Sequence, residues 1–363
     1  MANDQKTRRE FVRDGAAAAA GVTVGLSSAK AAAAKPNILN YNENMEYRRC
    51  GKSGLMISTV CLGGHWKRID KMVPGVFKTK SWLSADLNDP GFVKNRHDVV
   101  SRCIDVGINY IDACTGEEVQ TYSKALQGRR DKMYLGFSWY QHEMRFKPYQ
   151  DSVDRMIQGF EQGLRKCKLD YVDLWRITMH EQTSKSNTEK QIEIAMEALA
   201  KAKKSGKAHF TGVSSHDRPW LKKAIETYPD QMDMIVTPYT AKSKVLPEES
   251  LFDAVKKCDV GVFGIKPFAS ASLFKGNSAP DSPTAEEDNR LARMAIRYIL
   301  CNPAITAPIP GLISVAQVDN MAKAVKERRE LSKKEAAELK QATDEAWARL
   351  PEDYQWLKDW EYV

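Results

Sequence analysis

Residues 171–215 read YVDLWRITMHEQTSKSNTEKQIEIAMEALAKAKKSGKAHFTGVSS. The stretch begins and ends with short apolar runs, residues 171–178 and 208–215, that have the length and composition of buried parallel strands. Between the two runs, Ile194 and Leu199 belong to an apolar series at helical spacing, and Gly206 supplies a stop. The segment therefore predicts a strand, a helix and a second strand in succession.

Six further apolar runs of this kind extend the pattern along the chain. They cover residues 57–64, 108–114, 132–138, 232–239, 261–268 and 305–311. Eight strands that alternate with helical segments predict an α/β protein with a (β/α)₈ barrel. A doubly wound sheet is the competing fold. It is expected to have a Gly-x-Gly-x-x-Gly fingerprint after its first strand, but residues 62–65 (LGGH) lack that spacing.

Composition excludes several classes of protein. The chain has 363 residues, of which 42% are hydrophobic and 28% charged, so it is neither disordered, collagen-like nor a polytopic membrane protein. Its net charge of +8 is spread thinly, without a basic block interleaved with aromatic residues, and we expect no nucleic-acid partner. Seven cysteines without CxxC spacing indicate neither a disulfide framework nor a metal site.

The N-terminus has the three-part layout of an export signal. Arg8 and Arg9 precede a weakly apolar Ala/Gly-rich stretch and a run of alanines that ends at Ala34. The paired arginines resemble a twin-arginine signal, which predicts that residues 1–34 engage the twin-arginine translocation machinery and that the protein is exported to the periplasm or beyond. A disordered alanine-rich tail is the alternative. We expect no transmembrane segment in the mature chain.

Two segments fall outside the repeat of the barrel, which we place at residues 45–330. Residues 67–94 form a long loop after the first strand, where they would overhang the C-terminal mouth. Residues 331–363 begin with a capping box at Ser332 and end in an aromatic cluster. We expect this C-terminal helix and tail to pack on the barrel, with an oligomer contact as the alternative.

Reactive residues of such a barrel lie at the C-terminal ends of its strands, and residues two apart share a face. This rule pairs Asp112 with Cys114, Ser138 with Tyr140, Thr178 with His180, and Ser214 with His216. Asp112 follows an apolar run, where a buried carboxylate is costly without a partner. It therefore either orients a donor in a site or caps the helix that begins near Glu117.

Several segments together resemble the aldo-keto reductase family. They are residues 45–58 (MEYRRCGKSGLMIS), 107–113 (GINYIDA), 169–175 (LDYVDLW), 206–215, 266–268 (KPF) and 307–311 (APIPG). The likeness covers about residues 45–328 in order. It implies a (β/α)₈ barrel that binds NADP(H) across its mouth and transfers hydride to or from carbonyls and alcohols. The cofactor-binding residues that it implies are Ser214, Ser215, Lys266, Pro267, Phe268, Gly311, Gln317 and Asn320.

The catalytic residues of that family are an Asp, a Tyr, a Lys and a His, and only Asp112 matches. Glu117 stands where the Tyr would fall, Ser138 at the Lys position and Thr178 at the His position. Asp112 has thus lost the Lys charge that would keep it ionised. The resemblance implies NADP(H) as the cofactor. Because Ile313 stands where the family has a basic residue that binds the 2′-phosphate, NAD(H) is the alternative.

Two hypotheses of function follow. In the first, the protein is an oxidoreductase that acts on a small carbonyl or alcohol through a rebuilt proton relay. His180 is its leading donor because an imidazole titrates near neutral pH, with Tyr140 and Glu117 behind it. In the second, the barrel is catalytically silent and keeps a nucleotide- or ligand-binding cleft. Carbohydrate chemistry by paired carboxylates has weaker support, because such pairs usually come from different strand ends.

Overall fold

The structure is a computed structural model that describes residues 38–243, 249–358 and 360. The predicted export signal, residues 1–34, lies outside the described residues. Of the helices within the described part, none is both long and apolar enough to cross a membrane.

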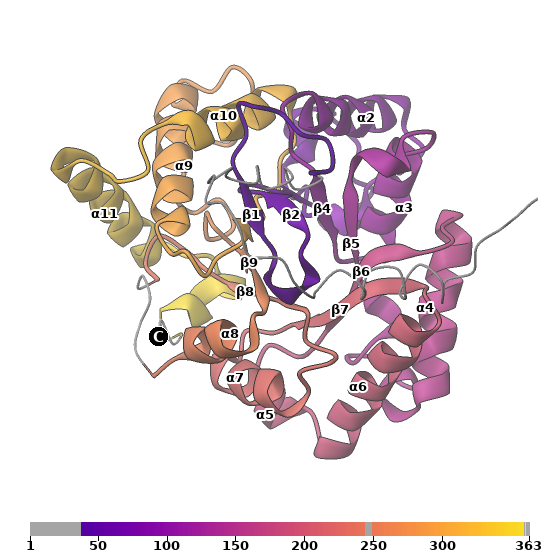
Figure 1. The fold of residues 1–363 in the computed structure, drawn as a ribbon. Coiled ribbons are helices and arrows are strands. Elements are labelled where there is room, and N and C mark those ends of the chain that lie inside the picture. The colour runs from indigo at the N-terminus through magenta and orange to yellow at the C-terminus, as the bar shows by residue number, and fades with distance from the viewer. Residues whose placement is uncertain (1–37, 244–248, 359, 361–363) are drawn as a thin grey trace, which may run out of the picture. The chain divides into compact units, whose positions relative to one another are not determined.

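The predicted barrel is confirmed. Eight parallel strands lie side by side in chain order, each paired with the next (Figure 1). They are β3 (Leu62–Gly63), β4 (Tyr110–Ala113), β5 (Tyr134–Phe137), β6 (Val172–Thr178), β7 (Ala208–Ser214), β8 (Met234–Pro238), β9 (Gly261–Ile265) and β10 (Ala307–Pro308). All eight fall within the apolar runs of the sequence.

The ring closes between its first and last strands. Gly63 forms a parallel bridge with Gly311, and its N–H donates to the carbonyl of Pro310 at 2.8 Å. A Cβ at position 63 would lie 2.7 Å from that same carbonyl oxygen, so only glycine allows the two strands to approach this closely. Closure removes the free edges that an open sheet would leave.

The prediction for residues 57–64 as one strand was wrong in its extent. Residues 56–58 form β2 (Met56–Ser58), which pairs antiparallel with β1 (Tyr47–Arg49), and only β3 enters the ring. The Ser58 hydroxyl donates to the Val60 carbonyl at 2.7 Å, a local bond that replaces the sheet ladder where the chain turns. The hairpin of β1 and β2 lies across the ring of strands (Figure 1).

Apolar side chains fill the ring of strands toward its amino-terminal end. Tyr110 and Phe263 stack with their ring centroids 4.4 Å apart, and both are fully buried beside Leu174 and Met234. Cys50 and Ile57 of the hairpin region join this cluster. The amino-terminal end is therefore packed solid, and a cavity can form only toward the carboxyl ends.

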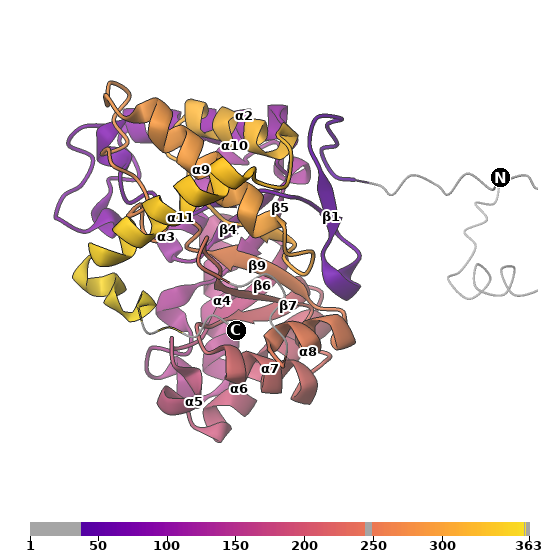
Figure 2. The same cartoon turned by 90° about the vertical axis from the view of Figure 1, so that its left-hand side faces the viewer.

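Helices surround the strands and bury their apolar stripes against them (Figures 1 and 2). In α4, Met156, Phe160 and Leu164 form the buried face, as their spacing predicts. The helices are α2 (Pro90–Asp105), α3 (Gly116–Ala125), α4 (Val153–Cys167), α5 (Thr183–Ser186), α6 (Glu189–Lys204), α7 (Arg218–Thr227), α8 (Leu251–Cys258), α9 (Ala285–Leu300), α10 (Val315–Lys326) and α11 (Lys333–Ala348). The short 3-10 turns are η1 (Gly51–Ser53), η2 (Ile69–Lys71), η3 (Trp82–Ser84), η4 (Arg130–Lys132), η5 (Tyr140–His142), η6 (Tyr149–Asp151) and η7 (Glu352–Leu357).

The C-terminal segment contacts the loops that follow the strands. Trp347, Leu350 and Tyr354 are buried and pack in one cluster with Ala269, which lies in the loop after β9. Trp360 donates its indole N–H to the carbonyl of His216, just after β7, at 3.0 Å. The tail thus brings aromatic side chains to the carboxyl end of the barrel.

Candidate active site

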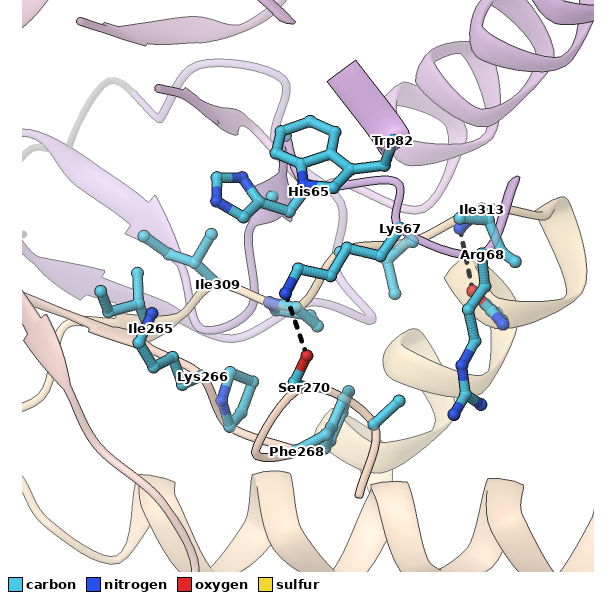
Figure 3. A pocket seen from close by; sticks show the side chains of 18 of the residues that line it. His65, Lys67, Arg68, Trp82, Ile265, Lys266, Phe268, Ser270, Ile309 and Ile313 are labelled. Atoms are coloured by element: carbon cyan, nitrogen blue, oxygen red, sulfur yellow. Dashed lines mark hydrogen bonds between the residues drawn. The ribbon is translucent and has the colours of Figure 1, made fainter. Parts of the chain in front are cut away.

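A cavity of about 620 Å³ lies at the carboxyl ends of the strands. Its lining runs from Asp112 and Arg176, on β4 and β6, to Asp288 of α9 and Asn320 of α10. The loops after β3 and β9 contribute side chains from opposite sides (Figure 3). This size and position match those of small-molecule sites in barrels.

A buried ion pair forms the base of the cavity. Arg176 donates to both carboxylate oxygens of Asp112, from Nε to Oδ1 at 2.8 Å and from Nη2 to Oδ2 at 2.6 Å. Its remaining amino group, Nη1, donates to the Thr178 hydroxyl at 3.0 Å. Both charged side chains are at most 5% exposed. The pair is held in the two-pronged geometry that suits a carboxylate and a guanidinium.

A second polar network lies behind Thr178. The buried carboxylate of Glu143 accepts from the Ser138 hydroxyl at 2.6 Å and from the Thr178 backbone N–H at 2.8 Å. Its other oxygen accepts from the Trp175 indole at 3.1 Å. Burial raises the pKa of Glu143, although these hydrogen bonds oppose the shift. Ser138 and Thr178 are thus bound within the wall, 2.9 Å apart.

A histidine and a glutamate meet at the wall formed by β3 and α3. Nδ1 of His65 lies 2.7 Å from Oε1 of Glu118. The Glu118 side chain is fully buried, while that of His65 is 46% exposed and lines the cavity. The His65 ring packs on Trp82, with centroids 4.6 Å apart (Figure 3).

Basic side chains lie between the two ends of the cavity. Lys67 donates to the Ser270 hydroxyl at 3.1 Å, and Arg68 donates to the carbonyl of Gly276 at 2.9 Å. Both contacts join the loop after β3 to the loop after β9, and Figure 3 shows the bond from Lys67 to Ser270. Lys266 lies 5.3 Å from the ring centroid of Tyr354. Among the described residues of the lining, these three cations have no buried carboxylate as partner.

The tail completes the wall near β7 and β9. Trp356 stacks on His216 with centroids 4.5 Å apart. Burial, together with the charges of Lys266 and Arg145, lowers the pKa of His216 well below its ordinary value. For Tyr354, burial acts to raise the pKa, but the charges of Lys266 and Lys67 outweigh it and lower this pKa.

Most residues singled out from the sequence line this cavity. They are Asp112, Tyr140, Ser214, Ser215, Lys266, Pro267, Phe268, Gly311, Gln317 and Asn320. Gln317 and Asn320 also have internal bonds, because Gln317 accepts from the Ile313 N–H at 2.9 Å and Asn320 accepts from Arg293 at 2.7 Å. The structure therefore brings together the residues of the cofactor side and the base of the cavity.

Glu117 and His180 are absent from the described lining of the cavity. Glu117 accepts from the side chain of Gln141 at 3.0 Å on the outer side of α3. Nδ1 of His180 lies 3.1 Å from Oδ1 of Asn187 in the loop after β6.

Two interpretations of Asp112 were wrong. It does not cap α3, because Thr115 is the N-cap and its side chain accepts from the Glu118 N–H. Nor has it lost its cationic partner, since Arg176 supplies the charge from the neighbouring wall of the barrel. Arg176 stands two residues before Thr178 and so shares its face of the strand, a signal that the sequence contained.

Sequence reasoning also missed His65 and Glu118. His65 directly follows the first apolar run and so obeys the strand-end rule that identified the other candidates. Glu118 follows Glu117 directly, and no local pattern in the sequence links it to His65. In the part of the chain that the structure describes, no three His, Cys, Asp or Glu side chains converge to hold a metal ion.

A family model and two relatives of known function were compared with this chain. The profile of the Aldo/keto reductase family matches residues 93–344. An L-glyceraldehyde 3-phosphate reductase of Escherichia coli is 23% identical over 264 residues, which cover 69% of this chain and 68% of that protein. An L-galactose dehydrogenase of Arabidopsis thaliana is 25% identical over 199 residues, covering 48% of this chain and 59% of that protein.

Solved structures share the fold. An aldo-keto reductase from Bacillus halodurans, in its holo form, aligns with a TM-score of 0.58 and 21% identity over 85% of this chain and 99% of that chain. An aldo-keto reductase from Klebsiella pneumoniae in complex with NADPH aligns with a TM-score of 0.58 and 18% identity, covering 82% of this chain and 94% of that chain.

Removing Arg176 tests the ion pair. We expect Arg176→Met to lower the free energy of unfolding by about 3–5 kcal/mol, because it leaves the Asp112 carboxylate buried without a partner. Adding Asp112→Asn to that variant removes the uncompensated charge and is expected to restore part of the loss. Urea unfolding followed by circular dichroism measures both changes. Equal stability of the wild type and Arg176→Met would contradict a paired, buried Asp112.

Stability below neutral pH tests the environment of His216. Because its folded pKa is lowered, the unfolded chain binds a proton below about pH 6.5 that the folded chain refuses. Stability is then lost as pH falls, by up to about 1.4 kcal/mol per pH unit until the folded pKa is reached. His216→Phe keeps a ring against Trp356 and removes the titration, so its unfolding midpoint between about pH 7 and 5 is expected to change less. Parallel curves for the two proteins would refute this assignment.

Proposed function

Because the chain belongs to the aldo/keto reductase family, we propose that it is an NADP(H)-dependent oxidoreductase that interconverts a small carbonyl compound and its alcohol. One observation carries the proposal. A single cavity joins the Asp112–Arg176 pair to the α9 and α10 end, and all the residues that the family likeness assigns to the cofactor lie in its lining. The NADPH complex of the Klebsiella pneumoniae relative supports the choice of cofactor.

The residues present fit a dinucleotide with several negative charges. Lys67 and Lys266 line the stretch between the two ends of the cavity, where the pyrophosphate of an extended dinucleotide would lie, and Arg68 lies farther toward Ser278 and Asp288. Ser214, at the end of β7, and Asn320, on α10, line the two ends. When bound, the nicotinamide cofactor supplies or accepts the hydride, and the protein supplies orientation, polarisation and a proton path.

Arg176 is the group that we assign to polarising the substrate oxygen. Its Nη1 donates to the Thr178 hydroxyl at the base of the cavity, while its Nε and Nη2 are held by Asp112. An arginine keeps its proton at all working pH values, so it stabilises negative charge on oxygen without giving up a proton. The proton must therefore come from a different side chain, and the relay differs from the family's Tyr and Lys.

Cofactor binding and turnover test the proposal directly. We expect the purified full chain to shift or quench NADPH fluorescence at micromolar cofactor, and to consume NADPH with at least one member of a panel of small aldehydes, ketones and their phosphorylated forms. Absence of any fluorescence change at high micromolar NADPH would contradict the proposed function. Binding without turnover across the panel would favour the silent barrel over the enzyme.

Arg68 tests the choice of NADP(H) over NAD(H). It reaches the part of the lining that contains Ser278 and Asp288, while Ile313 offers no charge to a 2′-phosphate. We expect Arg68→Ala to weaken NADPH binding about tenfold or more and to leave NADH binding nearly unchanged, since a charge-assisted bond to phosphate contributes roughly 1.5–3 kcal/mol. Arg328→Ala is the control, because Arg328 is exposed. Equal losses for NADPH and NADH would rule out this role for Arg68.

A further inference from the structure

We propose that His65 gives the substrate oxygen its proton during carbonyl reduction and removes it during alcohol oxidation, with Glu118 as its positioning residue. The inference rests on the proposed function and specifies the relay that the function requires. The family's Tyr, Lys and His positions hold Glu117, Ser138 and Thr178, and none of these presents a free proton-transfer group to the cavity.

The geometry of His65 is that of an oriented acid–base group. Its Nδ1 lies 2.7 Å from Glu118 Oε1 and the residue lines the cavity, so Nε2 is the nitrogen that we assign to the substrate. The ring packs on Trp82, which restricts its rotation (Figure 3). A base held by a buried carboxylate on one nitrogen and open on the other is the arrangement that general acid–base catalysis uses.

Glu118 is anchored so that its carboxylate faces His65. Its Oε2 accepts from the backbone N–H of Cys114 at 2.6 Å. Its Oε1 is buried and has no hydrogen-bond partner among the described residues, and His65 Nδ1 lies 2.7 Å from it. At position 64, a Cβ would lie 2.1 Å from Glu118 Oε2, and Gly64 thus makes room for the carboxylate.

The dyad adjoins the polarising pair. Glu118 binds the backbone of Cys114, and the Cys114 thiol lies 3.8 Å from Nη1 of Arg176. Cys114 therefore connects the two groups along one edge of the cavity. A carbonyl oxygen near Arg176 would lie on the same side of the cavity as His65, which a proton transfer requires.

The charged groups that contact His65 or line the cavity with it come from several elements. Glu118 of α3 is the one within 4 Å of its ring. Lys67 follows on its own loop, the Asp112–Arg176 pair of β4 and β6 lies at the base, and Lys266 lies across the cavity after β9. The side toward β10 presents Ile309 and the backbone of Gly311, which carry no charge. Glu118 is thus the carboxylate in direct contact with the imidazole.

The step balances in atoms and electrons. In the direction of reduction, the carbonyl carbon would receive one hydride, with its two electrons, from NADPH bound in the cavity. As the π pair moves onto oxygen, the N–H bond at His65 Nε2 breaks and the O–H bond of the alcohol forms. The imidazolium becomes a neutral imidazole and is protonated again by water, which reaches the half-exposed ring. Oxidation of the alcohol reverses each transfer.

Tyr354 is the competing donor in the same lining, because its pKa is lowered by Lys266 and Lys67. The test therefore compares His65→Gln with Tyr354→Phe, and uses His97→Gln as the matched control on the exposed face of α2. NADPH dissociation constants, kcat across pH and the imidazole signals of histidine-labelled protein are measured for each. Glu118→Gln and Glu118→Asp complete the set.

We expect His65→Gln to lose about 10²- to 10⁴-fold in kcat and to lose the dependence of kcat on pH that the wild type shows. We expect it to bind NADPH as tightly as His97→Gln does. Glu118→Gln is expected to move the His65 imidazole titration and the pH limb to lower pH, because a negative charge is lost. Glu118→Asp is expected to reverse these shifts in part.

Wild-type turnover with full activity in His65→Gln, or a loss confined to Tyr354→Phe, would overturn the assignment while leaving the proposed function intact. An unmoved His65 titration in Glu118→Gln would overturn the role of Glu118. Failure of the wild type itself to bind NADPH would instead refute the proposed function, and this inference with it.

Discussion

The bidentate ion pair between Asp112 and Arg176 is the interaction on which the site depends. A carboxylate at the end of a barrel strand is tolerated when a fixed positive charge meets it, and Arg176 does so from the strand two places along the ring. The pair also engages Thr178, which is held in turn by Glu143 and Ser138. The base of the cavity is consequently a bonded network with fixed charges.

This network has a chemical consequence. Arginine does not release its proton, and the hydroxyls of Ser138 and Thr178 are committed to neighbours within the wall. The base can therefore polarise a bound oxygen but has no proton to exchange with it. His65 and Glu118, on the adjoining wall, have the complementary property, since an imidazole can take up and release a proton and His65 lines the cavity.

The fold could be predicted because it depends on a repeated local pattern. Each apolar run had strand length, and helical spacing between runs implied parallel neighbours, so eight repeats led to the barrel. The cofactor side followed from segments such as residues 266–268 and 307–311, which are continuous in sequence. The hairpin at residues 47–58 was missed because an apolar run does not reveal where the bond from Ser58 to Val60 turns the chain.

The reacting side was harder to predict because its partners are distant in sequence. Asp112 and Arg176 are 64 residues apart, and no local rule says that an arginine within the run YVDLWRIT points into the barrel beside a carboxylate. His65 and Glu118 likewise meet only after β3 and β4 pair. By contrast, His180 satisfied the strand-end rule, but the loop after β6 turns it toward Asn187.

A crystal structure of the full chain with NADP⁺ tests the central claim most directly, namely that reaction takes place where the Asp112–Arg176 pair adjoins His65. We expect a nicotinamide ring at the β4 and β6 end of the cavity, with C4 facing the space between Arg176 Nη1 and His65 Nε2, and the adenosine toward α9 and α10. A nicotinamide bound at the α9 and α10 end, or a His65 side chain turned out of the cavity, would contradict it.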